Sequence, residues 1–323
     1  MCTRIIYETN TGKFITGRGM DWNDPTAKSR VVVYPRGLKQ TGGDMDNALT
    51  WTSKYGSIFS SFYDAASSDG MNECGLVANT LYLAEADYGD VALSEKPRMS
   101  IGAWNQYFLD NFATVAEAVE AMQDVPFIIA APMLPNGRAA AVHLAISDVS
   151  GDSAVLEYID GDLVIYHSKA HRVMTNSPTF DQQLAINNYW EIIGGNRMLP
   201  GTISAADRFV RVNYLLKSTP KFDDGVMATS AAMSIMRSIG VPLGMEDPDH
   251  PNISATLWRS LGDHEAKRYY FESSIQPAIF WLDIDSVNLE VGAPIMSVEV
   301  NGPESLFGDV TEQLKPLEKL TWL

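Results

Sequence analysis

Residues 1–22 read MCTRIIYETNTGKFITGRGMDW and contain two strand-like runs separated by a turn. The runs TRIIY and KFITGR flank the turn-rich stretch ETNTG, a pattern that predicts a β-hairpin. Cys2, one of only two cysteines in the chain, directly follows the initiator methionine. Because chain termini usually fray, a cysteine at this position is either accidental or chemical, and the rest of the sequence has to distinguish the two.

Removal of Met1 would leave Cys2 with both a thiol and a free α-amine. The reference pKa of an α-amine is ~7.7–8.0, so near neutral pH a useful fraction of it is an unprotonated base. A nucleophile and its general base would then share one residue, which is an established arrangement. The position alone leaves the alternative that residue 2 is a cysteine by chance and that the N-terminus has no chemical role.

Two further stretches favour the chemical interpretation of Cys2. The predicted hairpin would return Arg18 and Asp21, in GRGMDW, to the N-terminus. A guanidinium there would favour the thiolate, and a carboxylate could hold the α-amine by a charge-assisted hydrogen bond. In VMTNSPTF, Asn176 falls between a strand and a helix start, where its amide could donate to an oxyanion. The alternatives are an exposed arginine, a turn aspartate and a structural turn asparagine.

Composition restricts the class of protein. The chain has 323 residues, 46% of them hydrophobic, and a formal net charge of −16. Such an acidic chain should repel nucleic acid and anionic lipid surfaces. No apolar stretch approaches the ~20 residues needed to span a bilayer, and the N-terminus lacks a secretory signal. We therefore expect a cytoplasmic protein, or a periplasmic one if a leader was replaced by Met1.

Cofactor and metal motifs are absent from the sequence. There is no GxGxxG, P-loop, HExxH or GxSxG pattern, and two cysteines exclude a four-cysteine zinc site. His143 is expected to be a hydrogen-bonded strand histidine, and no histidine is placed as the partner of a nucleophile. Cys74 is expected to pack as a small buried residue. The sequence therefore predicts neither a metal nor an organic cofactor.

The remaining chain alternates between strand-rich and helix-rich stretches. Residues 100–123 have helical spacing, residues 140–167 predict a three-stranded meander, and HRVMTN is expected to continue that sheet. Residues 180–240 are expected to be helical, followed by the strand-like runs SATLWRSLGD, KRYYFES and AIFWLDI. This order predicts an α+β layered fold in which helices cover antiparallel sheets. Without linkers or repeats, one domain over residues 1–323 is expected.

Four stretches, in this order, resemble the choloylglycine hydrolase family: MCTRIIYETNTGKFITGRGMDW, GMNECGLVANTLYL, VMTNSPTFDQQL and SAADRFVR. The family contains penicillin V acylases and conjugated bile salt hydrolases. The resemblance extends from residue 2 to about residue 216. It implies the N-terminal nucleophile (Ntn) fold, a four-layer αββα sandwich, and hydrolysis of a linear amide.

The resemblance also implies roles for individual residues. Cys2 matches the nucleophile, and Arg18 and Asp21 match the pair that supports it. Asn176 matches the oxyanion-hole asparagine, and Tyr82 occupies the position whose backbone N–H completes that hole. Each oxyanion donor in such a site is typically worth ~2.7–4 kcal/mol.

Other positions bear on the substrate. Arg208, in DRFVR, matches the second active-site arginine of the family. Tyr82 stands where bile salt hydrolases usually have asparagine, so it resembles the penicillin V acylases and is an expected substrate contact. Trp22 is expected either to form a wall of an acyl pocket or to pack in the core. The short segment between Asn176 and Arg208, together with MDW, is similar to the Gram-negative acylases, some of which also hydrolyse N-acyl homoserine lactones.

The expected partner is a small-molecule amide. Family resemblance implies a homotetramer, but Gram-positive members use an extended loop for that assembly, and the chain has only the short segment. The alternatives are a conjugated bile salt hydrolase and a family member that binds an acyl ligand without turnover. A precursor that retains Met1 would lack the general base. A glutamine-dependent amidotransferase domain is disfavoured by TNSPTF and DRFVR.

Overall fold

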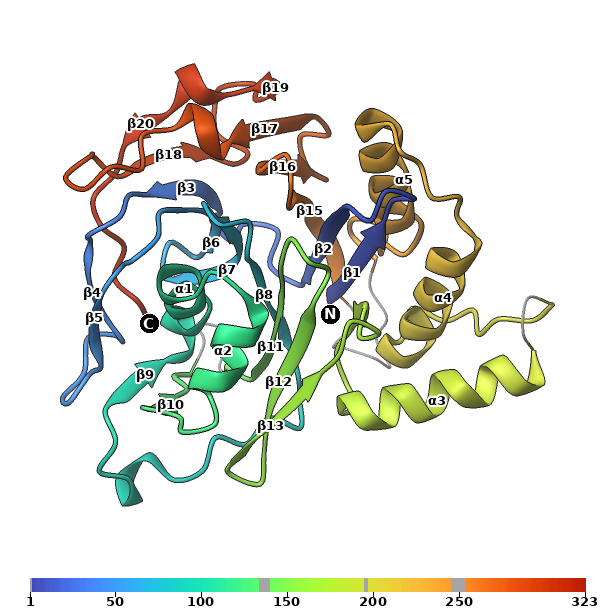
Figure 1. Cartoon of the computed structure of the whole chain (residues 1–323), viewed down its shortest axis with the longest axis horizontal. Coiled ribbons are helices and arrows are strands. Elements are labelled where there is room, and N and C mark those ends of the chain that lie inside the picture. The colour runs from blue at the N-terminus through green and yellow to red at the C-terminus, as the bar shows by residue number, and fades with distance from the viewer. Residues whose placement is uncertain (1, 134–139, 195–196, 246–253) are drawn as a thin grey trace.

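Two β-sheets stacked face to face form the centre of the molecule, and helices lie on the outer face of each (Figure 1). The architecture is therefore the predicted α+β sandwich with four layers in the order αββα. None of the helices in the described part of the chain has the length and apolar character needed to cross a bilayer. The computed structural model describes residues 2–133, 140–194, 197–245 and 254–323.

The first sheet has seven strands in the order β14-β1-β2-β15-β16-β17-β19. β1 and β2 form the predicted hairpin, with Cys2 directly opposite Met20. The three predicted C-terminal strands are β15, β16 and β17. The strand bounds are β1 Cys2–Glu8, β2 Phe14–Trp22, β14 Val173–Met174, β15 Ala255–Asp263, β16 Arg268–Ser273, β17 Ile279–Asp283 and β19 Gly308–Asp309.

The second sheet has nine strands in the order β13-β12-β11-β8-β7-β6-β3-β18-β20. β11, β12 and β13 are the predicted meander. The expectation that HRVMTN continues this sheet is wrong, because β14 pairs with β1 in the other sheet. The strand bounds are β3 Arg30–Tyr34, β6 Ser57–Phe62, β7 Ala66–Asn72, β8 Val77–Tyr82, β11 Val142–Ser147, β12 Ser153–Ile159, β13 Asp162–His167, β18 Met296–Glu299 and β20 Lys315–Pro316. Two strand pairs lie outside these sheets: β4 Lys39–Thr41 with β5 Thr50–Thr52, and β9 Arg98–Ser100 with β10 Ile128–Ala130.

The helices form two separate layers. The helix predicted over residues 100–123 is two helices, because Phe112 has an extended backbone and Thr114 caps a new helix by accepting the N–H of Glu117. The predicted helical stretch 180–240 contains three helices. The helix bounds are α1 Ile101–Asn111, α2 Val115–Ala121, α3 Phe180–Ile193, α4 Ala205–Ser218 and α5 Gly225–Ser238, and the 3-10 turns are η1 Val91–Leu93, η2 Ile284–Ser286 and η3 Thr311–Gln313.

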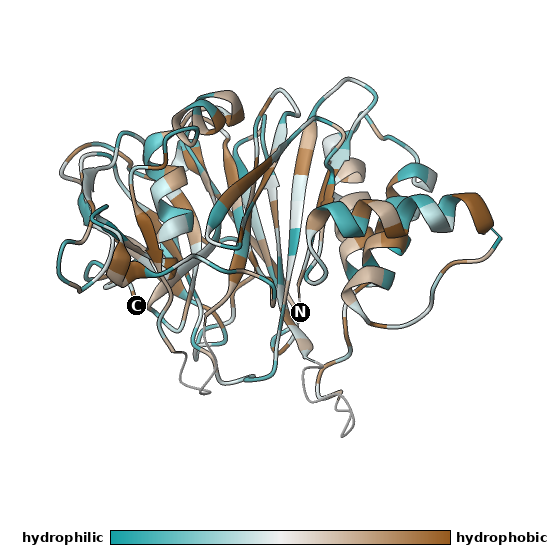
Figure 2. Cartoon of the chain, turned by 90° about the horizontal axis from the view of Figure 1, so that it is seen from below, coloured by the Kyte–Doolittle hydropathy of each residue, from teal (hydrophilic) through white to brown (hydrophobic). Residues whose placement is uncertain are grey.

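Apolar side chains fill the spaces between the four layers. One cluster joins residues of both sheets with α3, α4 and α5, and a second lies between the nine-stranded sheet and α1 and α2. The central strands are therefore buried on both faces, as in β1, where only Glu8 is not fully buried. Figure 2 shows hydrophobic stretches along the central strands and largely hydrophilic connecting loops. Polar side chains inside this double-sided core need partners, which makes them candidates for a site.

Candidate active site

The β1–β2 hairpin places the thiol of Cys2 between the two sheets. Cys2 is the first residue of β1 and is only 3% exposed. Because alternate residues of a strand share a face, Met20 opposite Cys2 and Arg18 two residues earlier both lie on the side of the thiol. Nη2 of Arg18 is 3.7 Å from Sγ of Cys2, and Sδ of Met20 is 3.9 Å from it. The sequence expectation that the hairpin brings Arg18 to Cys2 is confirmed.

Arg18 is a buried cation with few polar partners. Its Nη2 donates to the carbonyl of Thr80 on β8 at 3.1 Å, and its guanidinium lies 4.4 Å from the centre of the Trp258 ring. Among the described residues, its Nε and Nη1 have no hydrogen-bond partner. Burial raises the pKa of nearby Asp69, and the charge of Arg18 opposes that rise. The thiol of Cys2 therefore lies beside a buried positive charge.

Asn176 lies in the turn between β14 and α3, with both ends of its side chain engaged. Its Oδ1 accepts from the backbone N–H of Cys2 at 2.5 Å and from Nη2 of Arg208 at 2.9 Å. Its Nδ2 donates to the carbonyl of Tyr82 at 2.6 Å. An amide nitrogen has two N–H groups, so one more donor is available beside Tyr82.

The backbone of Tyr82 faces the same region as Asn176. The next residue, Leu83, donates its N–H to the carbonyl of Ala141 at 3.1 Å. In an antiparallel sheet, the N–H and C=O of one residue point to the same side, and successive residues alternate. The N–H of Tyr82 therefore points away from Ala141, to the side where its carbonyl meets Asn176.

Arg208 and Asp21 lie on the other face of the hairpin, beside the backbone of Cys2. Nη1 of Arg208 donates to the carbonyl of Cys2 at 2.6 Å and also to the hydroxyl of Thr3. Oδ2 of Asp21 is 3.8 Å from that nitrogen, and its Oδ1 accepts from the hydroxyl of Thr256 at 2.5 Å. Burial lowers the pKa of Arg208, and the charges of Asp21 and Cys2 oppose that change. The two faces thus hold different parts of Cys2: Arg18 the sulfur, and Arg208 the main chain.

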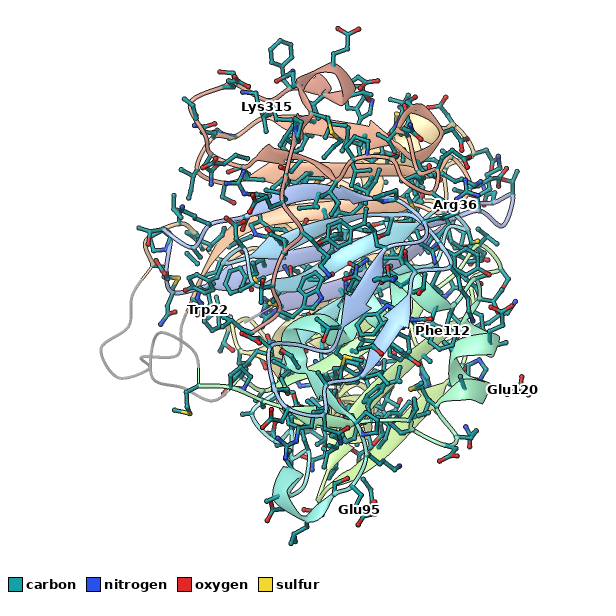
Figure 3. All side chains as sticks on the ribbon, turned by 90° about the vertical axis from the view of Figure 1, so that its left-hand side faces the viewer. Trp22, Arg36, Glu95, Phe112, Glu120 and Lys315 are labelled. Carbon is teal, nitrogen blue, oxygen red and sulfur yellow. The ribbon has the colours of Figure 1, made fainter. Side chains whose placement is uncertain are left out.

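A cavity of about 100 Å³ adjoins the thiol. Trp22, which is labelled in Figure 3, forms part of its wall and packs edge-to-face against Phe62 with ring centres 5.6 Å apart. Trp22 combines the two expected positions, because it lines the cavity and also packs, partly buried, against the central apolar cluster. The lining residues are Cys2, Arg18, Met20, Trp22, Phe62, Ala66, Ser67, Ser68, Thr80, Tyr82, Ile101, Gly102, Ala140, Ala141 and Val142.

Two other residues singled out in the sequence lie outside the cavity lining. His143 is fully buried, with Nδ1 2.7 Å from Oε1 of Glu157 and Nε2 2.8 Å from the carbonyl of Thr175. It is the hydrogen-bonded strand histidine that the sequence predicts. Cys74 was expected to be buried, but it is only half-buried in the turn before β8 and is free of any disulfide. Within the described ranges, no group of three or more His, Cys, Asp or Glu residues could hold a metal ion.

Sequence reasoning missed Met20 and Thr256. Met20 had a usable signal, because strand alternation places it on the same face as Arg18 and opposite Cys2. Thr256 had none, since it reaches Asp21 through the pairing of β15 with β2, across 235 residues of sequence.

Comparisons with known proteins identify the family of the chain. Residues 2–297 match the model of the linear amide C–N hydrolases, choloylglycine hydrolase family. Penicillin V acylase of Pectobacterium atrosepticum is 46% identical over 308 residues, which is 89% of this chain and 82% of that protein. A bile salt hydrolase/transferase of Clostridium perfringens is 26% identical over 317 residues, covering 90% of this chain and 94% of that protein.

Solved structures show the same fold. Penicillin V acylase from Agrobacterium tumefaciens superposes with a TM-score of 0.91 at 44% identity, covering 100% of this chain and 99% of the other. A variant of the conjugated bile acid hydrolase from Clostridium perfringens has a TM-score of 0.79 at 24% identity, covering 94% and 99% of the two chains, and supports the fold alone. The chain belongs to the choloylglycine hydrolase family and is a hydrolase of linear amide C–N bonds.

Proposed function

We propose that the chain is a penicillin V acylase-like amidohydrolase with Cys2 as its N-terminal nucleophile. One observation carries the proposal: Cys2 presents its sulfur to Arg18 and the cavity, and its nitrogen to Asn176 at 2.5 Å. In the given sequence that nitrogen follows Met1, which lies outside the described residues. Removal of Met1 would turn it into an α-amine beside the thiol.

The first half of the reaction forms an acyl-enzyme. The α-amine takes the thiol proton, directly or through a water, and the thiolate attacks the amide carbonyl. The N–H of Tyr82 and the second N–H of Asn176 Nδ2 stabilise the tetrahedral oxyanion. The C–N bond then breaks, and the leaving amine takes the proton from the ammonium of Cys2. The result is a thioester between Cys2 and the acyl group.

The second half of the reaction hydrolyses the thioester. The amine, neutral again, takes a proton from a water that attacks the thioester. The same two donors hold the second oxyanion, and the thiolate leaves as the carboxylic acid is released. Arg208 donates to the carbonyl of Cys2 and holds the main chain of that residue in place, and Asp21, 3.8 Å from Arg208, supports Arg208 there. The scheme needs neither metal nor organic cofactor.

The cavity favours a compact acyl group. Trp22 and Phe62 give it an aromatic wall, and its volume of about 100 Å³ is below the ~300–1,000 Å³ typical of pockets for drug-sized ligands. A phenoxyacetyl group or a medium acyl chain suits such a wall better than a steroid does. We therefore propose penicillin V and N-acyl homoserine lactones as substrates. Conjugated bile salts are the alternative substrate, and acyl-ligand binding without turnover is the alternative function.

The test is turnover by purified protein whose N-terminus has been identified by intact mass. The panel is penicillin V, a medium-chain N-acyl homoserine lactone and glycocholate, with Cys2→Ala as the matched control. Hydrolysis of either of the first two, abolished in Cys2→Ala, supports the acylase proposal. Hydrolysis of glycocholate alone overturns the substrate assignment. If Cys2-terminated protein hydrolyses none of the three amides, the proposed activity is wrong and ligand binding without turnover is supported instead.

We further propose that the protein is a single domain that assembles as a homo-oligomer. Family resemblance implies a tetramer, but the short segment between Asn176 and Arg208 gives that particular assembly less support. Light scattering during size-exclusion chromatography measures the assembly directly. A monomer at micromolar concentration would contradict it.

A further inference from the structure

The turn between β6 and β7 has a backbone that L-residues rarely adopt. Tyr63 has φ 55° and Asp64 has φ 53°, and the N–H of Ala65 closes the turn on the carbonyl of Phe62 at 3.1 Å. Glycine or asparagine normally occupies such positions, and a bulky aromatic residue there is unusual. Strain of this kind persists only where the surroundings hold it, and it clusters at functional sites.

Several interactions hold the strained turn. The carboxylate of Asp64 accepts from Nε of Arg30 at 3.1 Å and from the hydroxyl of Ser61 at 3.2 Å. The backbone N–H of Tyr63 donates to the carbonyl of Lys28 at 2.8 Å. The position of Tyr63 is therefore fixed from both sides.

The hydroxyl of Tyr63 links Trp22, the last residue of β2, to Asp24, two residues further along the chain. Nε1 of Trp22 donates to it at 2.9 Å, and it lies 2.8 Å from Oδ2 of Asp24. An indole N–H can only donate, so the hydroxyl must accept from Trp22 and direct its own proton to Asp24. Burial raises the pKa of Tyr63 to about 12, which keeps that proton in place near neutral pH. Thr26 holds the carboxylate of Asp24 in turn, from its backbone N–H at 2.9 Å and its hydroxyl at 2.6 Å.

This chain of contacts ends at the cavity beside Cys2. Trp22 and Phe62 both line the cavity, and Tyr63 itself does not. Tyr63 instead packs against Phe62, with ring centres 4.5 Å apart. Among the described residues, its hydroxyl reaches the cavity lining through the hydrogen bond to Trp22, which sets the orientation of that indole.

We propose that Tyr63 is a positioning residue that determines acyl specificity: held in a strained turn, it fixes the Trp22 indole and so the width of the cavity. The proposal rests on the proposed function. A wall of fixed position favours the flat acyl group that fits it and disfavours flexible chains that need it to move. Since Tyr63 touches no reacting atom, its effect falls on KM more than on kcat.

Tyr63→Phe removes the hydroxyl and retains the ring against Phe62. The loss of a neutral hydrogen bond should reduce the ratio of kcat/KM for penicillin V to that for N-decanoyl homoserine lactone by about three- to tenfold. Most of that change should lie in KM. Tyr189→Phe makes the same chemical change at an exposed position on α3 and should leave the ratio unchanged.

A second readout follows Trp22 without any substrate. The indole N–H resonance of Trp22 in the full chain, assigned by its absence in Trp22→Phe, reports the hydrogen bond to Tyr63. We expect it to shift and broaden in Tyr63→Phe and to be unaffected in Tyr189→Phe.

The two readouts separate the possible failures. An unchanged Trp22 resonance in Tyr63→Phe overturns the positioning role, whatever the activity. A shifted resonance with an unchanged selectivity ratio overturns the specificity role. If the wild-type protein hydrolyses neither acyl donor, the proposed function and the specificity role both fall, and the resonance still decides whether Tyr63 positions Trp22.

Discussion

Arg208 and Asn176 are joined by a hydrogen bond of 2.9 Å from Nη2 to Oδ1, and this contact fixes which end of the Asn176 amide faces Tyr82. An arginine can only donate, so it selects the oxygen end of the amide. The nitrogen end is thereby directed to the carbonyl of Tyr82, on the side of the cavity. A helix residue more than thirty positions away thus orients the proposed oxyanion donor.

Asn176→Ala should lower kcat by about 10²–10³-fold with a small change in KM, because it removes a donor that acts in the transition state. Asn176→Asp tests the orientation argument. Its carboxylate can still accept from Arg208, but it cannot donate to the oxyanion, so the loss in kcat should be similar. Near wild-type kcat in Asn176→Asp would exclude the donor role.

Thr256 should be needed to hold Asp21. Its Oγ1 accepts from the N–H of Val241 at 2.8 Å, so its own proton is directed to Asp21 at 2.5 Å. A hydrogen bond to a charged group contributes ~1.5–3 kcal/mol. We expect Thr256→Val to lower kcat/KM by about tenfold or more and Thr256→Ser to restore it, as measured by initial rates. Equal rates in Thr256→Val and wild type would show that Asp21 needs no such support.

Asp110 should make the folded state less stable as pH rises toward neutrality. Burial raises the pKa of Asp110 to about 7, although Trp51 and Gln106 both donate to its carboxylate. The folded state therefore holds a proton that the unfolded chain releases near pH ~4. The contribution of this residue is fully present below pH ~4 and is lost as pH rises through about 7.

The variant Asp110→Asn isolates this contribution. The free energy of unfolding in urea, measured at pH 5 and pH 8, should fall less with rising pH in Asp110→Asn than in wild type, by on the order of 2 kcal/mol. Burial lowers the pKa of His264 to about 4, so this residue makes the folded state more stable as pH rises. Its contribution is the same in both proteins and cancels when they are compared. Identical pH dependences would mean that Asp110 is not titrating in this range.

Local patterns predicted much of the fold. Alternation and turn residues predicted the β1–β2 hairpin and the meander, because the side-chain period of a strand is visible in the sequence. The end of α1 at Phe112 was not predicted, since Phe112 has no helix-breaking character of its own, although the capping-box spacing of Thr114 and Glu117 marks the start of α2. The pairing of β14 with β1 is a tertiary choice that a two-residue strand does not encode.

The residues of the site were predictable from the sequence, but most of their contacts were not. The predicted hairpin and the family resemblance together predicted that Cys2, Arg18, Asp21 and Asn176 come together. The odd spacing of Arg18 and Asp21 in one strand implies that they lie on opposite faces, but it does not show that Arg18 meets the sulfur of Cys2 and that Asp21 meets Arg208. Contacts such as Thr256 with Asp21, and Tyr63 with Trp22, join distant segments and leave no local signal.

The most direct test of the account is the intact mass of protein mixed briefly with penicillin V and quenched in acid. Cys2-terminated protein should gain the mass of one phenoxyacetyl group, located by peptide mapping on Cys2, and should turn over. Protein that retains Met1, and Cys2→Ala, should gain none and hydrolyse nothing. Turnover by either of these two proteins would contradict the central claim that Cys2 acts as nucleophile with its own α-amine as base.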